Sequence, residues 1–276
     1  MNARTFQIAV KIILFAAVSL TVAILLYIII FILYHGLPVL TLEFLSSPIR
    51  GMGKEGGIFP TIVSTLYIAI FAVIVATPMG VGTAIFLTEY TQEGRLTRVI
   101  RFGTDCLAGI PSIIFGLFGF IFFVITLRLG WSILSGALTL ACMMLPTIIR
   151  TSEEAIRSVP RGYRDVTYAL GGTKLQSIRH IVLPKALPGI LTGVILSMGR
   201  AVSETAALIF TAGMSVQTPT SVLSSGRSMA VHFYTLAREG ISAPNAYGTA
   251  AVLIITILAL NTVSYVLMHR YLKRYQ

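Results

Sequence analysis

Residues 61–87 have the sequence TIVSTLYIAIFAVIVATPMGVGTAIFL, a run without a single charge. About 20 mostly apolar residues are needed for a helix to cross the hydrocarbon of a bilayer, and this run is long enough. Polar or charged segments separate it from five similar runs, at residues 12–33, 106–126, 131–149, 187–214 and 246–268. The sequence therefore predicts an all-α integral membrane protein with six transmembrane helices.

The composition supports a membrane protein and excludes several other classes. Of 276 residues, 55% are hydrophobic and 11% are charged, whereas soluble domains carry about 25% charged residues. The net charge of +11 comes from basic residues spread between the apolar runs, which favours topology signals over nucleic-acid binding. Two cysteines and four scattered histidines give no disulfide framework, metal-ligand spacing or catalytic pair, and no Gly-rich phosphate loop is present. We expect a membrane protein without an ATPase or hydrolase site or cofactor of its own, and without a nucleic-acid partner.

The distribution of Lys and Arg predicts the orientation. With the N-terminus inside, fifteen of these residues lie in inner segments and five in outer loops, so both termini are predicted to be cytoplasmic. A cleaved signal peptide is the alternative for the first run, but its apolar core would be only about 7–15 residues long. The predicted parts are a first helix with its outer loop (1–55), a transmembrane domain (56–268) with a cytoplasmic loop (150–185), and a cytoplasmic tail (269–276).

Charged residues occur inside only one apolar run. Arg200 and Glu204 lie in the fifth, at a spacing that places them on one face of a helix. A charge at the bilayer centre costs about 2.5–3.5 kcal/mol on insertion scales, so such residues usually serve a function. Two interpretations remain open. The guanidinium lines a pathway for an anion whose oxygens match its planar fork, or the two residues form an ion pair that fixes helix packing.

The cytoplasmic loop has apolar residues at helical spacing. From Asp165, the pattern Val166, Ala169 and Leu170 predicts a short amphipathic helix that ends at Gly171-Gly172. A second apolar segment then leads through Ile181 and Leu183 to Pro184. One interpretation is a solvated basic loop kept inside by its charge. The other is a docking surface for a cytoplasmic partner, because an amphipathic helix needs something to cover its apolar face.

This loop resembles a family signature. Gly171, nine further residues and then Ile181-Val182-Leu183-Pro184 match the second half of the EAA loop, G-x9-I-x-L-P, of permease subunits of binding-protein-dependent ABC importers. The first half departs from the pattern, since Asp165-Val166-Thr167 stands where the family has Glu-Ala-Ala. Within the family the chain is most similar to phosphate permeases of the PstA type. That likeness rests on GGIFP at 56–60, PMGVG at 78–82, LAGIPSIIFGL at 107–117 and GRAVSETA at 199–206.

The resemblance implies a fold, a function and partners. The fold would be that of type I ABC importer (MetI-like) permeases, and the function import of inorganic phosphate by alternating access across a bacterial or archaeal cytoplasmic membrane. The partners would be a second permease (PstC-like), two ATP-binding subunits (PstB-like) and an extracytoplasmic phosphate-binding protein (PstS-like). A helix at 165–175 would couple to the ATPase, and phosphate would pass Arg200 and Glu204. The alternatives are another oxyanion (sulfate, molybdate or tungstate), or a channel or secondary transporter that works without an ATPase.

Overall fold

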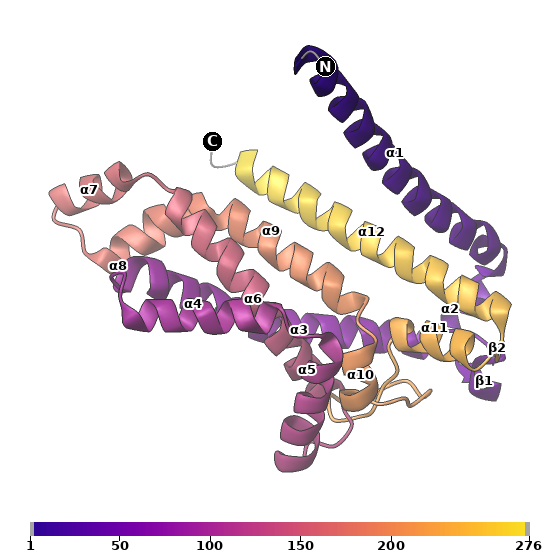
Figure 1. Cartoon of the computed structure of the whole chain (residues 1–276). Coiled ribbons are helices and arrows are strands. Elements are labelled where there is room, and N and C mark those ends of the chain that lie inside the picture. Colours follow the sequence, from indigo (N-terminus) through magenta and orange to yellow (C-terminus); the bar gives the residue numbers. More distant parts are fainter. Residues whose placement is uncertain (1–2, 274–276) are drawn as a thin grey trace.

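The protein is a bundle of long helices with shorter helices at its ends, seen in a computed structural model that describes residues 3–273 (Figure 1). The long helices are α1 (Ala3–Gly36), α3 (Phe59–Ile85), α6 (Ile133–Ser158), α9 (Leu183–Val202) and α12 (Ala243–Lys273). The shorter helices are α2 (Leu42–Ser46), α4 (Arg95–Ala108), α5 (Ser112–Gly119), α7 (Arg161–Ala169), α8 (Lys174–Ser177), α10 (Ala206–Thr211) and α11 (Met229–Arg238). Short 3-10 turns lie at Leu37–Val39 and Gly51–Gly53, and π-helical turns at Phe86–Tyr90, Phe120–Thr126 and Ile178–Val182.

Five helical segments of the described chain are long and apolar enough to cross a membrane alone. They are Val10–Val39, Phe59–Tyr90, Ile133–Ser158, Lys174–Val202 and Ala243–Arg270. A sixth span results if α4 and the segment Ser112–Thr126, bent by 104° at their junction, are taken together. The prediction of an all-α, multi-pass membrane protein is confirmed.

The third predicted span, 106–126, is wrong as a single straight helix. The charged residues before it are helical as part of α4, and the chain turns sharply before α5. The break lies at Gly109-Ile110-Pro111, where Pro111 is extended with φ −59° and ψ 142°. A proline disfavours helical backbone in the residue before it, so the sequence itself stops α4 here. By contrast, Pro78 and Pro146 lie inside continuous helices.

Two further expectations need correction. The fifth span, 187–214, is interrupted at residues 203–205, so that α9 and α10 are separate helices. The Ser/Pro/Gly-rich segment between the fifth and sixth runs, 215–245, is expected from its composition to be a loop but contains α11. Ser228 caps α11, because its hydroxyl accepts a hydrogen bond from the Val231 amide at 3.2 Å. Gly and Ser residues around this short helix hid it from the sequence interpretation.

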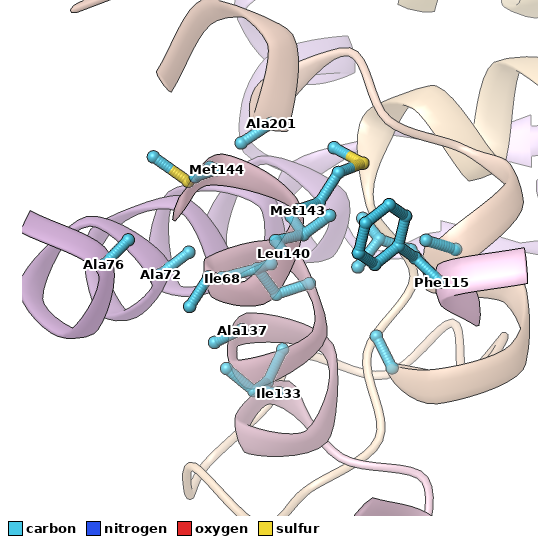
Figure 2. Close-up of a cluster of buried hydrophobic side chains, with 14 of the residues drawn as sticks. Ile68, Ala72, Ala76, Phe115, Ile133, Ala137, Leu140, Met143, Met144 and Ala201 are labelled. Atoms are coloured by element: carbon cyan, nitrogen blue, oxygen red, sulfur yellow. The ribbon is translucent and has the colours of Figure 1, made fainter. Parts of the chain in front are cut away.

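Small residues let the central helices pack closely. Figure 2 shows α3 meeting α6 through Ala72, Ala76 and Ala137, all fully buried, with Ile68 and Leu140 beside them. In a membrane, lipid tails are as apolar as the side chains, so helix association depends on close packing rather than on the hydrophobic effect. The alanines provide that close approach.

The two loops predicted to lie outside the membrane meet at one end of the bundle. The antiparallel pair β1 (Ile49–Arg50) and β2 (Glu55–Gly56) comes from the first loop and α11 from the second. Asn245, in the first turn of α12, ties the first loop to the bundle, since its side-chain amide donates to the carbonyls of Gly53 at 2.9 Å and Lys54 at 3.1 Å. Figure 1 shows α7 and α8 at the opposite end of the bundle.

Candidate transport pathway and coupling site

Arg200 lies in the last turn of α9, at the point where the fifth span is interrupted. Its side chain is exposed on the isolated subunit. The guanidinium makes no ion pair or hydrogen bond with any residue between 3 and 273. A planar, permanently charged group with free donors is suited to binding an oxyanion.

Glu204 faces the backbone rather than Arg200. One carboxylate oxygen accepts hydrogen bonds from the amides of Thr205 at 3.2 Å and Ala207 at 3.3 Å, at the start of α10. The preceding Ser203 hydroxyl donates back to the carbonyls of Gly199 and Arg200 at the end of α9. Polar side chains therefore satisfy backbone groups that the break leaves free, as a membrane environment requires.

The ion pair considered as an alternative for Arg200 and Glu204 is absent from the described structure. The predicted helix face does not exist at Glu204, because α9 ends at Val202. Glu204 instead holds the interrupted backbone, and Arg200 is left available. At about 1.5 Å of rise per residue, Arg200 lies roughly 25 Å along α9 from Leu183 at its start.

The helix predicted within residues 150–185 exists with different bounds. It begins four residues earlier than expected, at Arg161, and ends at Ala169, so the expected single helix over 165–175 is wrong. The left-handed Gly171, with φ +77°, ends it. Thr173 then starts α8 with a capping box, in which Thr173 and Gln176 bond each other's backbone amides.

The apolar face of this loop is exposed. Val166 is 59% exposed and Leu170 83%, one helical turn apart, and Ala169 and Asp165 are also exposed. On the second segment, Ile181 and Leu183 are half-buried and Pro184 is exposed. Thus α7 presents apolar side chains away from the bundle, while the segment from Ile181 connects it to α9.

Arg164, which the sequence interpretation did not single out, fastens α7 to the bundle. Its Nε and Nη2 atoms lie 3.0 and 2.6 Å from one carboxylate oxygen of Glu89, in the π-helical turn that extends α3. Its guanidinium also donates to the carbonyls of Val159 at 2.7 Å and Ile156 at 3.1 Å, at the end of α6. The two charged side chains are only 14% and 7% exposed.

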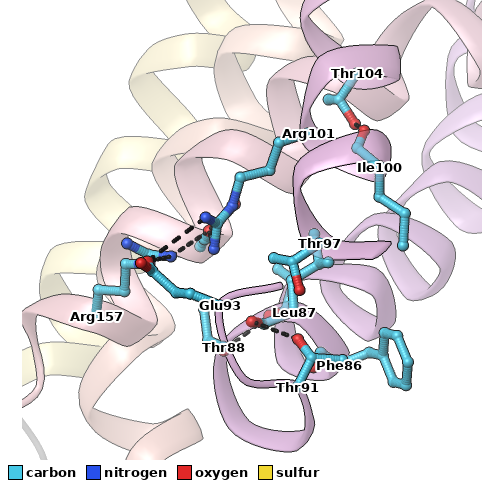
Figure 3. A network of polar contacts seen from close by, with 12 residues as sticks. Phe86, Leu87, Thr88, Thr91, Glu93, Thr97, Ile100, Arg101, Thr104 and Arg157 are labelled. Atoms are coloured by element: carbon cyan, nitrogen blue, oxygen red, sulfur yellow. Dashed lines mark hydrogen bonds and ion pairs between the residues drawn. The ribbon is translucent and has the colours of Figure 1, made fainter. Parts of the chain in front are cut away.

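A second charged cluster lies beside this pair. Glu153 of α6 accepts from Arg101 of α4 at 2.7 Å and from Arg157 at 2.9 Å. Figure 3 shows Glu93 between the same two arginines, at 3.7 and 3.8 Å. A cavity of about 610 Å³ separates the two clusters and is lined by both. Ion pairs thus join α4 to the C-terminal part of α6.

The opposite end of the bundle contains a buried arginine. Arg227 is 3% exposed; its Nε donates to the Met214 carbonyl at 3.1 Å, and one terminal nitrogen lies 3.4 Å from Nδ1 of His232. Burial lowers the pKa of Arg227. Burial, followed by repulsion from Arg227, lowers the pKa of His232 to about 4. The histidine is therefore neutral at pH 7 and can accept the arginine's hydrogen bond.

The family model for binding-protein-dependent transport system inner membrane components matches residues 76–276. The chain belongs to this family. The match includes α4, the loop with α7, and the interrupted span with Arg200. The permease is accordingly a multi-pass inner-membrane subunit of a transport system.

Relatives in bacteria extend the comparison. The probable ABC transporter permease protein YqgI of Bacillus subtilis is 32% identical over 84% of both chains. The phosphate transport system permease protein PstA 1 of Mycobacterium tuberculosis is 42% identical over 170 residues, which are 60% of this chain and 56% of that protein. A PstA of Pasteurella multocida is 35% identical over 64% of this chain and 63% of its own length. The alignments thus span little more than half of the PstA relatives.

Solved structures share the fold at low sequence identity. A chain of a bacterial ABC transporter involved in the import of alginate superposes with a TM-score of 0.66 at 14% identity, covering 97% of this chain and 99% of that one. A chain of the inward-facing methionine ABC transporter MetNI superposes with a TM-score of 0.65 at 17% identity, covering 78% of this chain and 95% of that one. These likenesses confirm the ABC importer permease fold of the MetI-like kind.

Proposed function

We propose that this permease is one subunit of an ATP-driven importer that moves inorganic phosphate across the cytoplasmic membrane by alternating access. The observation that carries the proposal is the free guanidinium of Arg200 at the interruption of the fifth span, in a chain 42% identical to a PstA phosphate permease over 170 residues. One arginine binds an oxyanion weakly enough to release it, as a transport pathway requires. Glu204 keeps the interrupted backbone in place and so positions Arg200.

The proposed assembly contains a second permease of the same fold, two ATP-binding subunits and an extracytoplasmic phosphate-binding protein. The exposed side chains of Val166 on α7 and of Leu170 directly after it support docking of an ATP-binding subunit, because such apolar residues are normally covered. The end of the bundle with α7 would then be cytoplasmic. Closure of the ATPase pair would move α7 and switch the permeases between inward- and outward-facing states.

Phosphate uptake in cells tests the pathway. We expect Arg200→Ala to abolish uptake at low external phosphate while the subunit reaches the membrane in normal amounts, because the oxyanion loses its charged partner. Glu204→Gln keeps an oxygen that can accept the two backbone hydrogen bonds and should retain most uptake, whereas Glu204→Ala should not. Normal uptake by Arg200→Ala would contradict the pathway role.

Competition identifies the substrate. Radiolabelled phosphate uptake that depends on this subunit, and that excess sulfate, molybdate or tungstate leaves unchanged, is the expected result. Inhibition by one of these anions would assign the permease to that oxyanion instead. Uptake that persists when the complex cannot hydrolyse ATP would indicate a channel or secondary transporter and would contradict the importer proposal.

A further inference from the structure

The helix α7 is held to the bundle mainly by polar contacts. None of its residues is fully buried, so apolar packing contributes little to its position. Two side chains within it reach other parts of the protein. Arg164 contacts Glu89 and the end of α6, and the ring of Tyr163 lies 4.0 Å beneath the ammonium group of Lys185 at the start of α9.

Arg164 makes the more extensive connection of the two. Its hydrogen bonds reach an acidic side chain on the extension of α3 and two carbonyls in the last turn of α6. A cation is also favourable at the negative end of the α6 dipole. Because both members of the Arg164–Glu89 pair are largely shielded from water, the pair is weakly screened and costly to break.

The Arg164–Glu89 pair lies where it connects α7 to the central helices α3 and α6. Glu89 follows α3 directly, and α3 and α6 pack along the central core of the bundle. Arg164 lies one position before Asp165, on the side of α7 facing the cavity, while Val166 and Leu170 point outward. If a partner displaces α7 by its outer face, the contacts of Arg164 with Glu89 and with the end of α6 link that movement to α3 and α6.

We infer that Arg164 and Glu89 are positioning residues that couple movement of α7 to α3 and α6. The inference rests on the proposed function, in which a cytoplasmic ATPase moves α7. Without the pair, α7 would still dock on the ATPase through its outer face, but its movement would be poorly transmitted. ATP would then be hydrolysed without a matching transport of phosphate.

The test measures phosphate transported per ATP hydrolysed by the complete complex in liposomes. We expect Arg164→Ala and Glu89→Gln each to lower this ratio about tenfold, within the range of known coupling effects, with ATP hydrolysis retained. Since Glu89 acts through Arg164, the double variant should be no worse than Arg164→Ala alone. Arg95→Ala is the matched control, because Arg95 is exposed on α4 and its side chain makes no ion pair within residues 3–273.

Hydrogen exchange of α7 amides provides a second measurement that does not depend on phosphate. Both single variants should accelerate exchange across residues 161–169 in the purified complex, and Arg95→Ala should not. Unchanged exchange and an unchanged transport ratio in both variants would overturn the inference. If the unmodified complex moved no phosphate, the proposed function would fail, and α7 exchange alone would then decide whether the pair positions this helix.

Discussion

Three arginines show how surroundings assign different roles to one residue type. Arg200 is exposed and its side chain has no polar partner within residues 3–273, Arg164 is largely buried against a carboxylate, and Arg227 is buried against a carbonyl and a neutral histidine. A free guanidinium can take a mobile anion, a paired one fixes two segments, and one bonded to carbonyls stabilises a loop. These differences come from neighbours that are distant in the sequence.

The buried His232 predicts a pH dependence of stability. Its pKa is about 4 in the folded protein against 6.5 for a free histidine, so between these values the unfolded chain binds the proton and the folded chain does not. The contribution of neutral His232 to the free energy of unfolding is therefore fully present above pH 6.5. It is lost as the pH drops towards 4, which lowers the free energy of unfolding by up to about 3 kcal/mol. We expect a lower melting temperature in detergent at pH 5 than at pH 7.5.

The variant His232→Gln isolates this contribution. Glutamine does not titrate, so the difference in melting temperature between the two pH values should shrink. The exposed His180, replaced by glutamine in the same way, should leave the difference as in the unmodified protein. An equal pH dependence in His232→Gln and the unmodified protein would show that another group is responsible.

At the scale of elements, turns and interruptions carry the functional features. The chain breaks at residues 109–111 and 203–205, and it turns after α7 at Gly171-Gly172. The two glycines are needed for different reasons. Gly171 has φ +77° with open space around it, whereas a side chain on Gly172 would meet Thr167.

At Gly171, a substitution should be tolerated if the new residue readily adopts the left-handed backbone conformation, whatever the size of its side chain. A non-glycine residue in left-handed conformation costs about 1–2 kcal/mol, and a β-branched one is strongly disfavoured, but asparagine adopts it more readily. We expect Gly171→Val to reduce phosphate uptake severalfold and Gly171→Asn to retain most of it, at equal subunit levels. Gly162→Val, in open space on α7 without positive φ, is the control. Equal uptake by both Gly171 variants would refute the requirement for this turn.

At the scale of the whole molecule, close helix contacts hold the bundle together. An added side-chain carbon on Gly193 of α9 would collide with the Thr151 hydroxyl of α6, and one on Gly80 of α3 would collide with Ile148 of α6. Side chains of α6 thus fill the space beside both glycines and leave no room for a further carbon there. Small residues at such contacts are the usual means of helix association in membranes.

Packing predicts opposite effects for two similar substitutions. Gly193→Ala should lower the melting temperature in detergent, because overpacking of a close contact costs about 1–3 kcal/mol. Gly82→Ala should leave it unchanged or raise it, since no atom lies within 4 Å of the added carbon and alanine favours helix. Equal melting temperatures for the two variants would contradict the close contact between α6 and α9.

The sequence predicted the membrane class, the approximate spans and the cytoplasmic helix from local information. Apolar length, the order of Val166, Ala169 and Leu170, and the Gly171 turn are all properties of neighbouring residues. The interruption before α10 was missed, because the apolar residues around Ser203 and Glu204 keep the run hydrophobic, and no local pattern shows that these two side chains bond the backbone there. The functional assignment of Arg200 remains a prediction from its charge and position.

Residence in the membrane was determined by the sequence alone, because the cost of transferring side chains into lipid depends on which residues lie within one run. Only the tertiary structure decided which charges meet. Arg164 and Glu89 are 75 residues apart in the chain, and no local pattern pairs them. They meet because α3 and α6 pack side by side through small residues, which brings the end of one helix to the start of α7.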